Sequence, residues 1–124
     1  MLEKIDSPKP VVALKAVGKL ERKDYDSVLL PALQSMIDGP GEIRLVLVLA
    51  GEFEGLTAGG TAADAGLYVS ELYHRELSKW KRCAVVTDRD WLRHSIAMFR
   101  WMMPGEVAVY DPAQLDEAVA WAAG

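Results

Sequence analysis

The sequence predicts an α/β protein of one domain, with strands and helices in the order ββαβαβαβα and a mostly parallel sheet. Short apolar strands alternate along the chain with helical patterns, which is typical of parallel sheets joined by right-handed crossovers. The 124 residues are enough for one domain with a buried core, and 51% of them are hydrophobic. The clearest strand–helix–strand unit covers residues 82–110, where a Pro-Gly break separates the helix from the second strand.

The N-terminal segment predicts a hairpin of two strands. Leu2–Ile5 is a short strand candidate, and Val11–Val17 is the second. The two prolines in Ser7–Pro10 cannot donate hydrogen bonds to a ladder and favour a turn between the strands. We expect Gly18 to end the hairpin.

A helix is predicted over Arg22–Ile37, because apolar residues recur there at helical spacing. Pro31 lies inside this helix, lacks a backbone donor and should kink it. Asp38–Gly41 ends the helix with glycine and proline, which favour a helix exit. The apolar positions that define the pattern are Tyr25, Val28, Leu29, Ala32 and Met36.

The next strand, Ile43–Leu49, is continuously apolar apart from one arginine. Such a run suits a parallel strand covered on both faces. The glycine-rich segment 50–60 is expected to be a loop. Thr61 then predicts a helix N-cap with Asp64 completing a capping box, and the helix should cover Ala62–Lys79.

A second buried strand is predicted over Arg82–Val86. Thr87 and Asp90 repeat the threonine-x-x-acid capping pattern, which predicts a helix over Arg89–Met102. The last strand is expected at Glu106–Tyr110.

The C-terminal helix has the strongest start signal in the chain. Asp111 is a good N-cap, Pro112 suits the first helical position and Gln114 completes a capping box. We expect its inner face to carry Leu115, Ala118, Val119 and Trp121. Because successive crossovers place helices on one side of a sheet, the sequence leaves open whether the opposite face is covered.

A series of short motifs recurs across nearly the whole chain in the order known from one protein family. They are Gly18-Lys19, Asp24-Tyr25, Leu30-Pro31-Ala32, Phe53-Glu54-Gly55, Ala84-Val85-Val86-Thr87-Asp88 with Trp91, Gly105-Glu106-Val107, and Ala118 with Trp121. The chain resembles the SpoIIAA-like proteins, a bacterial group related in fold to STAS domains and to CRAL-TRIO lipid-carrier domains. The resemblance implies a five-stranded sheet with four helices. It also implies two functions: binding of an apolar ligand or membrane surface, or partner switching as in anti-sigma-factor antagonists.

Partner switching in those antagonists uses a phosphorylated serine or threonine within an Asp-Ser-Ser-Gly-like stretch. The corresponding region here offers Thr57 and Thr61 but has no Asp-Ser-Ser sequence. Phosphate at a helix N-terminus would be electrostatically tolerated. The capping box already explains Thr61, so these two threonines are weak phosphorylation candidates.

Membrane or ligand contact is suggested by the helix near residue 100. Trp91, Leu92, Ile96 and Phe99 can face the core. Further large apolar residues then exceed what one buried stripe needs: Met98, Trp101, Met102 and Met103. The basic residues Arg93, His94 and Arg100 flank them. This composition suits an interfacial helix, a lid over an apolar pocket, or a dimer interface.

Most catalytic and metal-binding classes lack support in the sequence. His74 and His94 are the only histidines and do not have zinc-ligand spacing. Cys83 is the only cysteine and is expected to be structural, as in a reducing cytoplasm. Asp88 and Asp90 could be paired carboxylates at a strand end, but turn and capping roles explain them more simply. The glycine-rich segments match no phosphate-binding motif.

The net charge and the composition of individual segments argue against several classes of partner and location. The formal net charge of −4 argues against nucleic acid, whose binding proteins usually carry a basic surplus. The first residues do not resemble a signal peptide, and no apolar run reaches membrane-spanning length. We therefore expect a cytoplasmic protein, with peripheral membrane contact as one option.

These features together favour a non-enzymatic binding module without a cofactor or metal. Its site would lie between the segment 55–64 and the helix 93–103 and would accept an apolar or amphiphilic ligand, or a membrane surface. The expected contact residues are Phe53, Leu56, Arg93, Phe99, Arg100, Trp101, Met102 and Met103. The alternative is a protein-interaction module, working as a homodimer or a partner switch.

Overall fold

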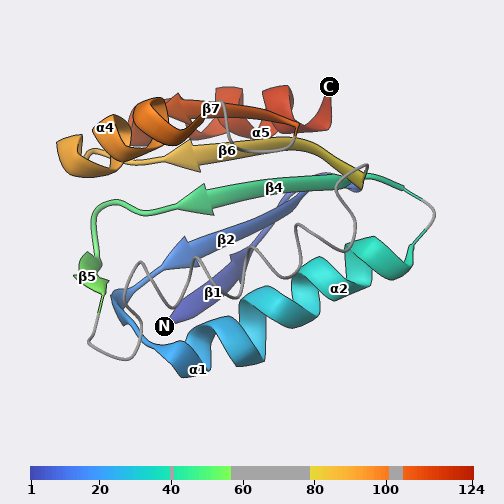
Figure 1. Ribbon diagram of the computed structural model, residues 1–124, viewed down its shortest axis with the longest axis horizontal. Coiled ribbons are helices and arrows are strands. Elements are labelled where there is room, and N and C mark those ends of the chain that lie inside the picture. Colours follow the sequence, from blue (N-terminus) through green and yellow to red (C-terminus); the bar gives the residue numbers. More distant parts are fainter. Residues whose placement is uncertain (40, 57–78, 101–104) are drawn as a thin grey trace.

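The computed structural model describes residues 1–39, 41–56, 79–100 and 105–124, apart from the side chains of Arg22, Tyr25, Leu56 and Phe99. These residues build a five-stranded mixed sheet with the strand order β1-β2-β4-β6-β7. Its strands are β1 (Leu2–Ile5), β2 (Val12–Ala16), β4 (Ile43–Val48), β6 (Trp80–Val86) and β7 (Glu106–Tyr110). β1 is antiparallel to β2, and the other neighbours are parallel (Figure 1). The predicted N-terminal hairpin and the mostly parallel sheet are confirmed.

A second, two-stranded sheet was not predicted from the sequence. β3 (Gly18–Leu20) pairs in parallel with β5 (Phe53–Leu56). Gly18 was expected to end the hairpin; its φ of +68° instead turns the chain out of β2 and into β3. β5 falls in the segment expected to be a loop. Local pattern could not reveal this pairing, because its strands are short and far apart in sequence.

The first helical segment contains α1 (Arg22–Asp24), π-helical turns over Tyr25–Leu29, and α2 (Leu30–Asp38). The predicted helix is therefore present, and its irregularity lies directly before Pro31. A proline removes one backbone donor and clashes with the carbonyl four residues earlier. The wider π-helical turns are a recognised way to accommodate such a break.

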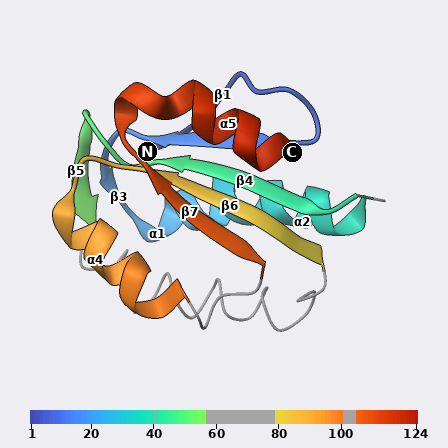
Figure 2. The same ribbon diagram turned by 90° about the horizontal axis from the view of Figure 1, so that it is seen from above.

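Helices cover both faces of the main sheet (Figure 2). α2 and α4 (Asp90–Phe99) lie on one face, and α5 (Leu115–Ala123) lies on the other. α5 packs on small strand residues: Ala118 and Ala122 share a cluster with Ala13 and Ala84, and all four are fully buried. Small side chains on both sides permit this close approach. The predicted helix over Ala62–Lys79 lies outside the described residues except for Lys79.

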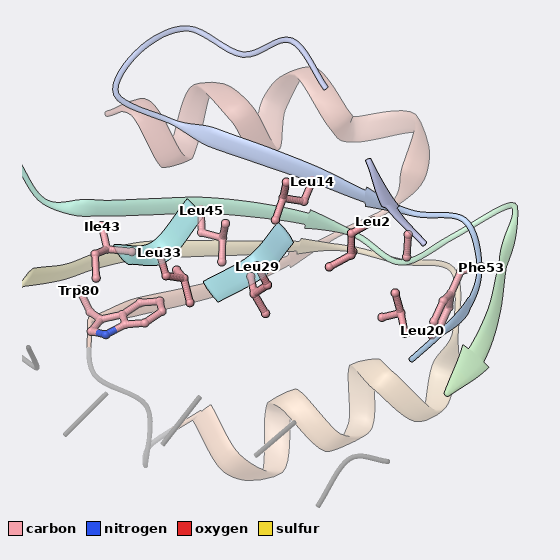
Figure 3. Close-up of a cluster of buried hydrophobic side chains, with 10 residues drawn as sticks. Leu2, Leu14, Leu20, Leu29, Leu33, Ile43, Leu45, Phe53 and Trp80 are labelled. Carbon is pink, nitrogen blue, oxygen red and sulfur yellow. The ribbon is translucent and has the colours of Figure 1, made fainter. Parts of the chain in front are cut away.

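The largest core cluster lies between the sheet and α2 (Figure 3). It contains Leu2, Leu14, Ala16, Leu20, Leu29, Leu33, Ile43, Leu45, Phe53 and Trp80. A smaller cluster joins Ile96 of α4 to Val85 of β6 and Val107 of β7. α4 is thereby fixed over the last two strands of the sheet.

Two arginines, one in β4 and one in β6, donate hydrogen bonds to carbonyl oxygens at the C-terminal end of α5. Arg44 donates a 2.7 Å hydrogen bond to the carbonyl oxygen of Ala122, and Arg82 donates one of 2.6 Å to that of Trp121. The Arg82 guanidinium also lies 5.1 Å from the centre of the Trp121 ring. Positive charge at a helix C-terminus is stabilising. At the other end, the predicted capping box of Asp111 and Gln114 is confirmed, and the first turn, Pro112–Gln114, is a 3-10 helix.

Candidate functional site

The ends of β4 and β6 are joined through one buried hydroxyl group. Thr87 directly follows β6 and is fully buried. Its Oγ1 donates a 2.8 Å hydrogen bond to the carbonyl oxygen of Leu49 and accepts one of 3.0 Å from the backbone N–H of Arg89. The predicted role of Thr87 as a helix N-cap is wrong, because α4 begins later and its N-cap is Arg89. The threonine instead stabilises the turn between β6 and α4.

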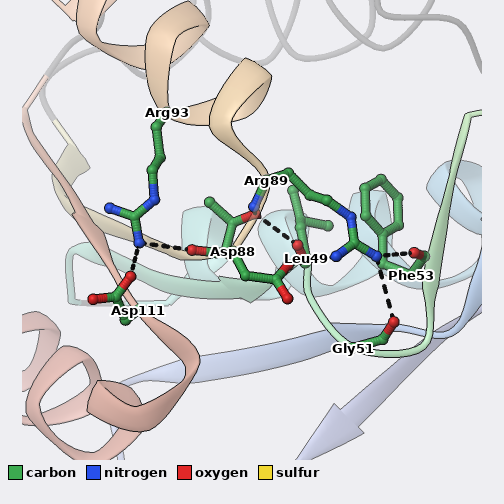
Figure 4. A network of polar contacts seen from close by, with 8 residues as sticks. Leu49, Gly51, Phe53, Asp88, Arg89, Arg93 and Asp111 are labelled. Atoms are coloured by element: carbon green, nitrogen blue, oxygen red, sulfur yellow. Dashed lines mark hydrogen bonds and ion pairs between the residues drawn. The ribbon is translucent and has the colours of Figure 1, made fainter.

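Arg89 links the start of α4 to the connection between β4 and β5 (Figure 4). Its guanidinium donates to the carbonyl oxygen of Phe53 at 2.6 Å and to that of Gly51 at 3.4 Å. It also pairs with the carboxylate of Asp88 at 2.5 Å and lies 6.0 Å from the centre of the Phe53 ring. This arginine was not predicted to have a role, since nothing in the local sequence distinguishes it from a solvated helix residue.

Arg93 was expected to bind an anionic head group. In the structure its guanidinium instead donates hydrogen bonds to the carbonyl oxygen of Thr87, at 2.9 Å, and to the carboxylate of Asp111 (Figure 4). These contacts join the first turns of α4 to the chain that follows β7. The charge of Arg93 is therefore already compensated within the protein.

The expected apolar contact residues divide into three groups. Phe53 is only 3% exposed and belongs to the core, so its side chain is not available for contact with a membrane surface. Its backbone lies in β5, and its side chain belongs to the core cluster that also contains Leu20 and Leu29. The side chains of Leu56 and Phe99 are outside the described part of the structure. So are Trp101, Met102 and Met103, and the phosphorylation candidates Thr57 and Thr61.

α4 nevertheless presents large apolar side chains to solvent. Trp91 is 50% exposed and Met98 is 65% exposed, and they are two turns apart on the same side of the helix. His94 lies between them and is also exposed. We call Trp91, His94 and Met98 the outer stripe of α4. The expectation that Trp91 faces the core is wrong, because Ile96 fixes the opposite side of the helix against the sheet.

Arg100 follows the outer stripe at the end of α4. It is exposed, and it forms no ion pair with the described residues. Among the described residues from His94 to Arg100, the exposed basic side chains are His94 and Arg100.

Nucleophilic and metal chemistry find little support in the described residues. Burial raises the pKa of the Cys83 thiol to about 12, so the thiol stays protonated and unreactive at neutral pH. No group of three or more histidine, cysteine, aspartate or glutamate side chains in the described ranges is arranged to hold a metal ion. Among the described helices, none is long and apolar enough to cross a membrane.

Comparison with known proteins places the chain in a family. Residues 11–123 match the family described as SpoIIAA-like. A crystal structure of an uncharacterised DUF3478-family protein from Shewanella loihica PV-4, with a SpoIIAA-like fold, superposes with a TM-score of 0.70 at 25% identity. The superposition covers 98% of this chain and 91% of that one. No match was found among curated proteins. On the family match and the shared fold, the chain belongs to the SpoIIAA-like family.

Proposed function

We propose that this protein is a non-enzymatic binding module that contacts amphiphiles, at a membrane surface, through the outer stripe of α4. The carrying observation is the exposure of Trp91 and Met98 on one side of a helix whose other side is fixed to the sheet. Tryptophan prefers the boundary between water and lipid, where its ring is partly apolar and its N–H remains polar. Methionine is flexible and fits irregular apolar surroundings.

The electrostatics favour insertion of apolar side chains over attraction to anionic lipid. The net charge is −4, and Arg93 is neutralised by Asp111. Only Arg100 and protonated His94 would face the head groups from α4. Because like charges repel at a negative surface, we expect binding to neutral vesicles to be at least as strong as binding to anionic ones.

The test is flotation with phosphatidylcholine vesicles, with and without phosphatidylserine. Wild-type protein should float with both. Trp91→Glu and Met98→Glu each place a charge in the stripe and should weaken partition by about tenfold or more. Ala120→Glu is the matched control, because Ala120 is exposed on α5 at the opposite face of the sheet. It adds the same charge and should leave flotation unchanged.

A tryptophan readout sharpens the result. Lipids brominated on their acyl chains should quench the fluorescence of wild-type protein, and Trp91→Phe should lose most of that quenching. Absence of flotation and of quenching in the wild type would end the lipid proposal. Equal flotation of the stripe variants and the wild type would move the contact to another surface.

The alternative is a protein-interaction module that uses the same stripe. The supporting observation is also the exposure of Trp91 and Met98, since both residue types are enriched at protein interfaces. The two functions differ in one readout: a protein partner would protect the stripe from solvent without lipid present.

A further inference from the structure

β7 forms an edge of the main sheet and has no strand on its outer side among the described residues. Natural proteins usually protect such edges with charged residues, prolines or very short strands. The other edge strand, β1, carries the exposed residues Glu3 and Lys4. β7 has only Glu106, at its start, and that carboxylate is paired with Arg82 at 3.0 Å. The rest of β7 is uncharged and buried or half-buried.

The direction of the backbone groups in β7 follows from one hydrogen bond. The N–H of Thr87 donates to the carbonyl oxygen of Tyr110 at 2.9 Å, so the peptide groups of Tyr110 face β6. Directions alternate along a strand, and Ala108 therefore also faces β6. The N–H and C=O groups of Val107 and Val109 consequently point away from the sheet, into the unpaired edge.

We propose that β7 pairs antiparallel with β7 of a second copy of this chain, in a register centred on Ala108. In this register Val107 lies opposite Val109 of the second copy, and each pair exchanges both backbone hydrogen bonds. The outward groups of both strands are then satisfied. Glu106 lies opposite Tyr110 of the second copy, so no like charges meet directly across the new ladder.

The helices above the sheet suit this arrangement. α4 lies over β6 and β7, and a two-fold axis perpendicular to the sheet puts the second α4 on the same face. The two helix axes would be about two strand spacings, or roughly 10 Å, apart. Packed helices lie about 8–10 Å apart. Arg93 identifies the side of α4 nearest the end of β7, and one turn later Ala97 offers an exposed, small side chain for the contact.

The pairing has a consequence for binding. Both outer stripes would lie on one face of the dimer, and two weak contacts on one surface act together. The dimer itself does not depend on the proposed lipid contact, because its evidence is the edge of β7 and not the stripe. Experiments without lipid therefore test it separately.

Sedimentation velocity over a range of concentrations is the first test. Wild-type protein should sediment with twice the chain mass of 13.6 kDa. Val109→Pro removes an outward N–H that donates to none of the described residues, and prolines are tolerated on edge strands. We expect this variant to raise the dimer dissociation constant by about tenfold or more while keeping its circular dichroism spectrum.

The matched control is a proline on the other edge. Val17 donates to the carbonyl oxygen of Met1, so Met1 faces β2 and, by alternation, the N–H of Lys4 faces outward. Lys4→Pro should leave the dimer intact. A wild-type monomer at all concentrations, or a Val109→Pro variant as dimeric as the wild type, would overturn the proposal.

A cross-link tests the register directly and remains informative if Val109→Pro fails to fold. Ala108 would face its own copy as a non-hydrogen-bonded pair, with Cα atoms about 4.5 Å apart. That separation lies in the range of disulfides, about 4.4–6.8 Å. In a Cys83→Ala background, Ala108→Cys should oxidise to a covalent dimer much faster than Ala120→Cys on the outer face of α5. Equal rates for the two variants would refute the register.

Discussion

The guanidinium group of Arg89 donates a 2.6 Å hydrogen bond to the carbonyl oxygen of Phe53, a residue 36 positions earlier in the chain. This contact ties the start of α4 to the small sheet of β3 and β5. One side chain therefore links two parts of the fold that are separate in sequence. The same residue stacks loosely over the Phe53 ring, whose side chain is buried in the core.

Arg89→Met should loosen this connection while keeping much of the apolar stem. We expect a loss of roughly 1–3 kcal/mol in the free energy of unfolding, since hydrogen bonds from a charged donor are removed. Amide hydrogen exchange over β5 should accelerate more than exchange over β4. Arg89→Lys keeps the charge but not the planar guanidinium group. Its free energy of unfolding should therefore lie between those of the wild type and Arg89→Met. Unchanged exchange in β5 would show that the contact does not hold the small sheet.

Thr87→Val should destabilise the protein although the two side chains have similar shapes. The substitution leaves the carbonyl oxygen of Leu49 and the N–H of Arg89 without their hydroxyl partner in a fully buried position. The expected cost is about 1–3 kcal/mol, measured by chemical denaturation. Thr87→Ser keeps the hydroxyl and loses only a methyl group, so it should cost less. If serine proved the more damaging substitution, packing and not hydrogen bonding would be the main role.

Two glycines with positive φ provide a matched pair. Gly105 has φ +73°, and an added Cβ would lie 2.6 Å from the carbonyl oxygen of Trp80. Gly51 has φ +60°, and an added Cβ would meet nothing within 4 Å. Gly51→Ala should therefore lower the free energy of unfolding by about 1–2 kcal/mol, because alanine is strained in a left-handed backbone conformation. Gly105→Ala adds a clash with backbone and should cost roughly 2–5 kcal/mol. Equal thermal denaturation midpoints for the two variants would contradict this ranking.

Cys83 should make stability depend on pH in the alkaline range. Burial raises the pKa of its thiol from 9.0 to about 12. Above about pH 9 the unfolded chain loses this proton while the folded protein keeps it, so the folded state becomes relatively less stable up to about pH 12. Denaturation at about pH 8 and about pH 10.5 should show a larger decrease for wild type than for Cys83→Ala. Identical decreases would mean that the thiol ionises equally in both states.

The reactivity of the same thiol offers an independent check. A thiol reagent at neutral pH should modify Cys83 slowly in the native protein and rapidly in denaturant. The thiolate is the nucleophile, and burial disfavours it. Rapid modification of the native protein would place the thiol in contact with solvent.

Local sequence patterns were enough to identify the strands of the main sheet and the start of the last helix. Ile43–Val48 is apolar enough to identify itself as a covered strand, and Asp111 with Gln114 forms the predicted capping box. These features depend on residues close together in the chain, where composition and spacing carry the physical information. The resemblance to SpoIIAA-like proteins also came from motifs in the sequence and is confirmed by the family match.

The exposure and the pairing of individual side chains could be seen only in the folded protein. Trp91 and Phe53 exchanged their expected roles, because the orientation of α4 and the pairing of β3 with β5 depend on contacts between distant segments. Arg93 was predicted from the sequence to bind an anionic head group, yet Asp111 compensates its charge. α5 covers the second face of the sheet because alanines on strand and helix meet there, a fit that no local pattern encodes.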